Sequence, residues 1–257
     1  MTAMTQRVEC LDKGFVRLVD HMGSDLTVVN AARVSFAKES KMESEVFEDL
    51  ESAEAWGNVD YDFLYSDRWM GGYYAERLSE KDARLIRHLA KHEHWTPFGH
   101  PQVTLHFKWP VFVARQAMRS NIGICWNEES RRYIQTEPEF YEPKVWRSKP
   151  EGSIKQGSGE ESWEVALLYP GLDQMCLQQY EDLLELGIAP EMARMVLPQS
   201  MYTECWGTFS LAALSRFYKL RSDSHAQKEI QDYAAAIDSL VRPLYPVSWK
   251  ALTGKEE

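Results

Sequence analysis

Cysteine is scarce in this chain. The 257 residues include four cysteines, and no two of them form a CxxC pair: Cys10, Cys125, Cys176 and Cys205. This spacing argues against zinc ribbons and dithiol redox motifs. The chain also lacks an apolar run long enough to span a bilayer, and residues 1–11 lack a signal-peptide pattern. We therefore expect a cytoplasmic protein without disulfides, membrane anchor or metal site.

Positive charge is also in short supply. Lysine and arginine number 29 against 39 acidic residues, which gives a formal net charge of −10. Nucleic-acid and membrane surfaces require broad positive fields, so neither is an expected partner. A small anion can still bind where a few arginines gather. The hydrophobic fraction of 44% is ordinary for a globular chain that buries a sizeable core.

The pattern of elements predicts one α+β domain over residues 1–257. Residues 102–109 alternate between apolar and polar side chains, as a half-buried strand does. Helices and strands are mixed without regular βαβ alternation, and no internal repeat is present. Several other segments show a helical or strand pattern. They are helices at about 25–36, 79–89, 110–119, 172–187, 190–197, 210–220 and 224–241, and a strand at 201–209.

Capping patterns and composition mark several boundaries. Ser79-x-x-Asp82 and Ser224-x-x-Gln227 resemble capping boxes that open helices. Residues 39–75 are rich in Asp and Glu, so we expect a solvated acidic insertion there. Residues 147–162 are rich in Ser, Gly, Lys and Glu, which predicts a loop.

Two neighbouring segments concentrate groups that suit an anion. Arg115, Gln116 and Arg119 would share one face of a helix that begins at Pro110. If residues 126–133 are extended, one side carries the side chains Glu128, Ser130 and Arg132. A guanidinium beside a hydroxyl suits a phosphate.

Two further arginines lie on separate elements, Arg194 after Pro190 and Arg221 before a helix start. Each has a simpler explanation, because Glu191 and Asp223 are close enough in sequence to form structural ion pairs with them. Helix N-termini attract anions, which favours an anion-binding role for Arg221.

The arrangement resembles the flavin-dependent thymidylate synthase (ThyX) family. Its signature reads Arg-His-Arg, then Ser after seven or eight residues, within Asn-Glu-x-Ser-x-Arg-Tyr. This chain has Arg119-Ser120-Asn121 and then Ser130 within Asn127–Tyr133. Six more segments resemble the family and occur in family order. They are 11–16, 31–35, 96–98, 114–116, 193–198 and 220–227.

The resemblance implies a fold, an assembly and a set of roles. The fold would be a central, mostly antiparallel sheet flanked by helices, in a homotetramer whose active sites draw on several subunits. Arg221 would be catalytic by polarising the pyrimidine near N3 and O4. The implied nucleotide set is Gln116, Arg119, Glu128, Ser130, Arg132, Arg194 and Arg221. The implied flavin set is Ser35, Thr96, Arg119, Glu128 and His225.

The resemblance further implies methylation of dUMP at C5 with methylenetetrahydrofolate, FAD and NADPH. The departures from the family lie mostly at flavin positions, namely Ser120, Asn121, Gly99 and Ala212. Two alternatives therefore stay open. One is flavin-poor or flavin-free hydroxymethylation of dUMP or dCMP, and the other is a non-catalytic nucleotide-binding module. Neither the base nor the added group follows from the sequence.

Overall fold

A computed structural model describes residues 6–61, 71–134, 136–151, 157–159, 162–163 and 171–254. The chain forms two compact units. The first unit combines Met1–Met22 with Gln102–Leu244, and the second combines Gly23–Pro101 with Tyr245–Glu257. In the described part of the chain, no helix is long and apolar enough to cross a membrane.

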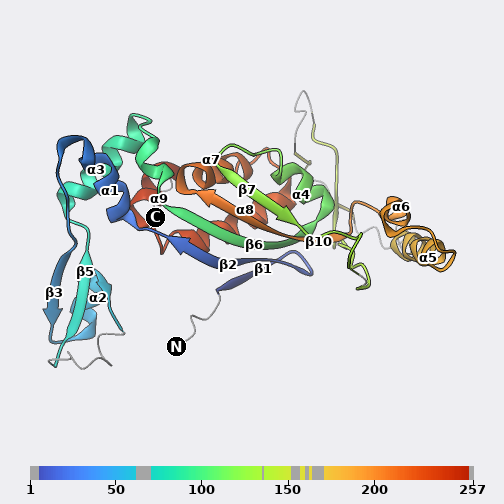
Figure 1. The fold of residues 1–257 in the computed structure, drawn as a ribbon, viewed down its shortest axis with the longest axis horizontal. Helices are drawn as coiled ribbons and strands as arrows, with labels where there is room; N and C mark the ends of the chain where they lie inside the picture. The colour runs from blue at the N-terminus through green and yellow to red at the C-terminus, as the bar shows by residue number, and fades with distance from the viewer. Residues whose placement is uncertain are drawn as a thin grey trace. The chain divides into compact units, whose positions relative to one another are not determined.

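The first unit is built on a five-stranded sheet in the order β1-β2-β6-β10-β7 (Figure 1). Every neighbouring pair is antiparallel, which confirms the predicted sheet type. The strands are β1 (Arg7–Cys10), β2 (Gly14–Met22), β6 (Gln102–Pro110), β7 (Ile124–Glu128) and β10 (Tyr202–Ser210).

The alternation predicted for residues 102–109 is present in β6. Val103, Leu105, Phe107 and Trp109 are all fully buried, while the residues between them are half-buried. Phe107 and Trp109 stack with their ring centroids 4.3 Å apart. Three helices contact strands of this sheet: α4 (Val111–Ala117), α7 (Leu211–Arg221) and α8 (Lys228–Val241). One sheet face therefore forms the core, and the apolar half of the alternation lies on it.

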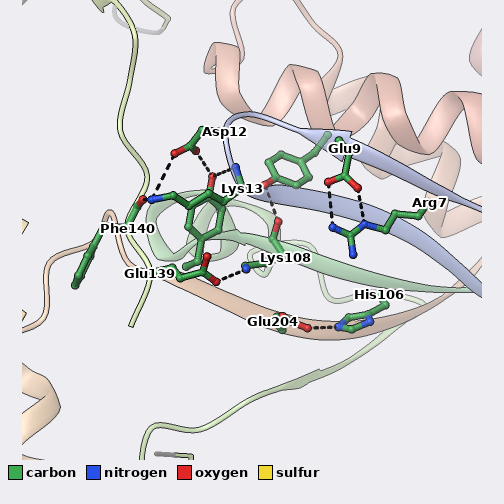
Figure 2. Close-up of polar contacts among 11 residues, drawn as sticks. Arg7, Glu9, Asp12, Lys13, His106, Lys108, Glu139, Phe140 and Glu204 are labelled. Carbon is green, nitrogen blue, oxygen red and sulfur yellow. Dashed lines mark hydrogen bonds and ion pairs between the residues drawn. The ribbon is translucent and has the colours of Figure 1, made fainter. Parts of the chain in front are cut away.

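Polar contacts join the turn of the β1–β2 hairpin to other parts of the first unit (Figure 2). The Tyr202 hydroxyl donates to Asp12 Oδ1 at 2.6 Å, and Lys13 Nζ donates to the Phe140 carbonyl at 2.9 Å. Gly14 is required here, because a Cβ atom at this position would lie 2.0 Å from the Tyr233 hydroxyl oxygen. This close approach of backbone to side chain accounts for a glycine at the turn.

Two predicted helix starts are confirmed and one is wrong. The side chains of Ser79 and Ser210 accept hydrogen bonds from backbone amides at the starts of α3 (Glu80–Lys91) and α7. Ser224 does not cap α8, whose N-cap is Gln227. The reason is a tight turn before the helix, in which the Ala226 amide donates to the Asp223 carbonyl at 2.9 Å.

The remaining elements of the first unit follow β7. They are the two-stranded pair β8 (Trp146–Arg147) and β9 (Ser162–Trp163), then α5 (Leu172–Glu185), α6 (Pro190–Ala193) and a 3₁₀ turn over Arg194–Val196. The loop predicted for residues 147–162 thus contains a short strand pair, and residues 152–156 and 160–161 lie outside the described part.

The second unit packs three helices together: α1 (Asp25–Arg33), α3 and α9 (Pro246–Thr253). Two 3₁₀ turns, Val34–Phe36 and Thr96–Gly99, complete this cluster. The carboxylate of Asp25 is buried and caps α9 across the fold, accepting from the amides of Val247 at 2.8 Å and Ser248 at 2.9 Å. The free amides at the N-terminus of α9 are satisfied in this way.

Replacing Asp25 by Ala is expected to lower the free energy of unfolding by about 1–3 kcal/mol, because two buried amides lose their acceptor. Urea denaturation measures the loss. Asp20→Ala is the matched control, since Asp20 is exposed and accepts a hydrogen bond from the amide of the adjacent His21. Equal stabilities of the two variants would contradict this account of the α9 cap.

The acidic insertion predicted at 39–75 has regular structure as well as charge. A three-stranded antiparallel sheet in the order β3-β5-β4 carries one helix. Its elements are β3 (Glu43–Phe47), α2 (Leu50–Trp56), β4 (Asn58–Val59) and β5 (Tyr73–Arg77). Phe47 and Trp56 lie 5.5 Å apart between ring centroids, and Arg77 lies over the Trp56 ring. Residues 62–70 lie outside the described part.

Candidate functional site

A cleft of about 1220 Å³ lies in the first unit, between the end of α4, α7 and the loop that leads into α8. Its lining includes four residues from the two predicted sets. They are Gln116, Arg119, Arg221 and His225. Three further cations line it: Arg147, Arg216 and Lys219.

Arg221 is the most constrained cation of the cleft. It is 8% exposed, and its Nη2 atom donates to the backbone carbonyl of Gln116 at 2.5 Å. Its Nε atom and the Oε1 atom of Gln116 are buried, and neither has a hydrogen-bond partner in the described part of the chain. Burial, and then the neighbouring charge of Arg119, lower the pKa of Arg221. A donor on Arg221 and an acceptor on Gln116 therefore lack partners among the described residues, and both residues line the same cleft. Buried polar groups are seldom left unpaired where no ligand binds.

The lining is strongly positive although the chain as a whole is negative. Among the described residues, no carboxylate lies within ion-pairing distance of the cations Arg119, Arg216, Lys219 and Arg221. Asp223 is the acidic residue of the lining, and it bonds His225 instead, with Oδ1 2.9 Å from the ring Nδ1. The simpler explanation of Arg221, an ion pair with Asp223, is therefore wrong, and the charges of the cleft favour an anion.

The helical face predicted to carry Arg115, Gln116 and Arg119 is incomplete. Helix α4 ends at Ala117, so Arg119 lies in the turn beyond it and not one helical turn from Arg115. Gly123 adopts a φ of +75° in this turn, and the Arg216 side chain donates to the Ile122 carbonyl at 2.9 Å. The turn, not a helix face, orients Arg119 toward the cleft.

Four predicted nucleotide residues do not line this cleft: Glu128, Ser130, Arg132 and Arg194. The extended run expected through residue 132 is wrong, because β7 ends at Glu128 and the Tyr133 amide closes a turn onto the Ser130 carbonyl at 2.9 Å. Within that turn the Arg132 Nε atom lies 3.4 Å from Ser130 Oγ. Arg194 is exposed, and no ion pair with Glu191 forms among the described residues.

A second cleft of about 910 Å³ lies wholly in the second unit and contains the predicted Ser35 and Thr96. Its floor is apolar, with Ala31, Leu85, Leu89 and Pro97. Lys38, Lys81 and Arg84 also line it. Arg33 belongs to the lining as well, but it pairs with the buried Asp82. Burial alone would raise the pKa of Asp82, and hydrogen bonds from Arg33 and its neighbours lower it overall.

Comparison with known proteins places this chain in a family. The sequence model of the family described as thymidylate synthase complementing protein matches residues 17–247. The chain belongs to this family. A flavin-dependent thymidylate synthase of Kosmotoga olearia is 34% identical over 248 residues, which cover 95% of this chain and 92% of the relative. One from Thermosipho africanus is 37% identical over 245 residues, covering 94% and 91%. The resemblance to the ThyX family is confirmed.

The fold agrees with solved structures of ThyX-like enzymes. The UMP/dUMP methylase PolB from Streptomyces cacaoi, bound with 5-Br dUMP, superposes with a TM-score of 0.70 at 28% identity. The match covers 96% of this chain and 97% of PolB. The predicted α+β ThyX-type fold is confirmed.

Some departures from the ThyX pattern lie at or near the first cleft. Ser120 stands where the family has His and lines the cleft, and Asn121 follows in the same exposed turn. Ala212 is buried at the start of α7, and Arg216 lies one helical turn further along, with its charged group toward the cleft. A cation thus remains in this region although the family's own residues are replaced.

Proposed function

We propose that this protein methylates dUMP at C5, using methylenetetrahydrofolate as the one-carbon donor. The observation that carries the proposal is a positively charged cleft lined by Arg221 and Gln116, each of which has a buried polar atom without a hydrogen-bond partner among the described residues. A pyrimidine edge offers a hydrogen-bond donor next to an acceptor, which is the complement of such a pair. Family membership and the relatives' activities support the same reaction.

Arg221 has the properties required to activate C5. Negative charge develops on N3 and O4 as C5 attacks the methylene carbon, and a fixed guanidinium beside those atoms lowers the barrier. The charge is held rigidly, because α7 ends at Arg221 and the Gln116 carbonyl accepts one of its hydrogens. The C5 proton is lost when the methylene group is transferred, and no cysteine nucleophile is needed for this step.

The phosphate-binding half of the site is proposed to come from neighbouring copies in a homotetramer. An exposed turn carries Ser130 and Arg132, and Glu128 lies at the end of β7. None of the three lines the cleft of its own chain. Arg194 is likewise exposed. The helices α5 and α6, together with the segments that directly follow them, expose a set of large apolar side chains: Leu172, Met175, Leu186, Ile188, Met192 and Met195. Such a surface is typical of a covered interface.

The residues present fit an FAD molecule in part. The apolar floor and cationic rim of the second cleft suit an amphipathic anion, with Ser35 and Thr96 as hydrogen-bonding groups. The other flavin positions that the resemblance implies, Arg119, Glu128 and His225, belong to the first unit. Arg216, which lines the first cleft, would replace a cation that the family has there. When bound and reduced by NADPH, FAD supplies the hydride that completes the methyl group. The chain's own part is to hold the nucleotide and stabilise charge on its ring.

Product analysis tests this proposal. The purified protein is incubated with methylenetetrahydrofolate and with dUMP, UMP or dCMP, with and without FAD and NADPH, and the nucleotides are analysed by mass. We expect dTMP from dUMP, and only when FAD and NADPH are both present. A 5-hydroxymethyl nucleotide formed without FAD would instead support hydroxymethylation. Absence of any C5 product, with nucleotide bound, would support a non-catalytic binding module.

A further inference from the structure

A buried ion pair borders the first cleft outside the residues that the family resemblance assigns. Arg147 on β8 donates through Nη2 to both carboxylate oxygens of Glu229, at 2.7 and 2.8 Å. Its Nε atom donates to Ser158 Oγ at 2.7 Å. Glu229 is 4% exposed and also accepts from the Tyr141 hydroxyl at 3.3 Å. Burial would raise the pKa of Glu229, but the hydrogen bonds from Arg147 lower it overall.

This pair joins three separate stretches of chain at the rim of the cleft. Glu229 is in the first turn of α8, directly after the loop that carries Asp223 and His225. Arg147 and Ser158 are 11 residues apart in the sequence, and both line the cleft. Gly157 lies against the same loop, since a Cβ on it would be 3.5 Å from the His225 carbonyl oxygen.

The charge of Arg147 is already neutralised, which sets it apart from the other cations of the cleft. Arg119, Lys219 and Arg221 have no carboxylate partner among the described residues, whereas Arg147 is held by Glu229. A neutralised guanidinium adds little attraction for a phosphate. Its geometric effect is larger, because one planar group with fixed donors fixes the positions of Glu229 and Ser158 together.

We propose that Arg147 is a positioning residue of the nucleotide site, which holds the wall at Gly157–Ser158 against the Asp223–Gln227 loop through Glu229. The inference rests on the proposed function. Displacement of this wall would loosen the nucleotide without removing Arg221 or any other group that touches the pyrimidine. The expected signature is therefore a higher KM for the nucleotide, with kcat and the folate KM nearly unchanged.

Arg147→Lys is the main test. A lysine keeps the charge but cannot bond Glu229 and Ser158 at once, so the nucleotide KM should rise by about tenfold, and kcat should stay within about threefold. Arg147→Met alone would leave Glu229 buried and unpaired. The double variant Arg147→Met/Glu229→Met avoids this, because apolar replacement of a buried pair is often neutral for stability. Its Tm should match the wild type while its nucleotide KM rises like that of Arg147→Lys.

Arg242 and Asp238 provide the matched control on the same helix. Arg242 Nη2 also bonds both oxygens of its partner, at 3.0 and 2.8 Å, but neither residue lines the cleft. Arg242→Lys should leave the nucleotide KM unchanged. The inference is overturned if Arg147→Lys keeps the wild-type nucleotide KM, or if Arg242→Lys raises it equally. If the wild-type protein itself turns over no pyrimidine nucleotide, the proposed function fails instead.

Discussion

Replacing Arg221 by Ala is expected to lower kcat/KM for dUMP by about 10²–10³-fold, equivalent to about 3–4 kcal/mol of transition-state stabilisation. The loss should appear mainly in kcat, since the guanidinium interacts more strongly with the charged ring of the transition state than with neutral uracil. Guanidinium ion added to the Arg221→Ala enzyme should restore part of the rate, because the deleted group leaves space beside the Gln116 carbonyl.

Arg115→Ala is the control for this substitution. Arg115 is an exposed arginine on α4, close to Gln116 in sequence but absent from the cleft lining. Its removal should leave kcat/KM near the wild-type value. If Arg221→Ala binds dUMP and turns it over as the wild type does, the catalytic assignment of Arg221 is wrong. If neither the wild type nor any variant has turnover, the chain is a binding module.

Mixing two inactive variants is expected to restore activity if each site draws on two subunits. Arg221→Ala and Arg132→Ala should both be nearly inactive as homotetramers. After subunit exchange at equal concentrations, about a quarter of the sites should combine an intact Arg221 from one chain with an intact Arg132 from another. The structure supports this division, because Arg221 lines the cleft and Arg132 lies in a turn outside it.

The control mixture pairs Arg221→Ala with Gln116→Ala. These two residues border the same cleft in one chain and are joined by the 2.5 Å hydrogen bond. No hybrid site can then contain both intact groups, so mixing should restore nothing. Recovery in the control, or none in the Arg132 mixture after confirmed exchange, would contradict a site divided between subunits in this way.

Local signals in the sequence predicted the framework well. The alternation along β6 was informative because helices cover one sheet face and leave the other half-exposed. Ser79 and Ser210 act as helix caps because their hydroxyl groups accept hydrogen bonds from the amides of Asp82 and Ala213 in the first turns. Ser224 failed as a cap because Asp223 forms a turn with His225 and Ala226, which delays the helix to Lys228. A capping pattern does not reveal such a competing turn.

The site was predictable only where residues act within one chain segment or match a family motif. Arg119 and Arg221 both line the cleft, but Arg119 does so from a turn and not from the helix face that was predicted with Arg115 and Gln116. Arg147 gave no signal, because it lies in a Ser- and Gly-rich stretch and its partner Glu229 is 82 residues away. Long-range pairing of this kind follows from tertiary packing, which periodicity and capping rules do not predict. Contributions from a second subunit are beyond any single-chain pattern.

We infer that the nucleotide base lies beside Arg221 in the cleft of the first unit. A crystal of the protein soaked with 5-bromo-dUMP tests it directly, because the anomalous signal of bromine marks the position of C5. We predict a bromine peak in the cleft next to Arg221, with the base edge bonded to Arg221 Nε and Gln116 Oε1. A fully occupied nucleotide whose bromine lies elsewhere would contradict the account.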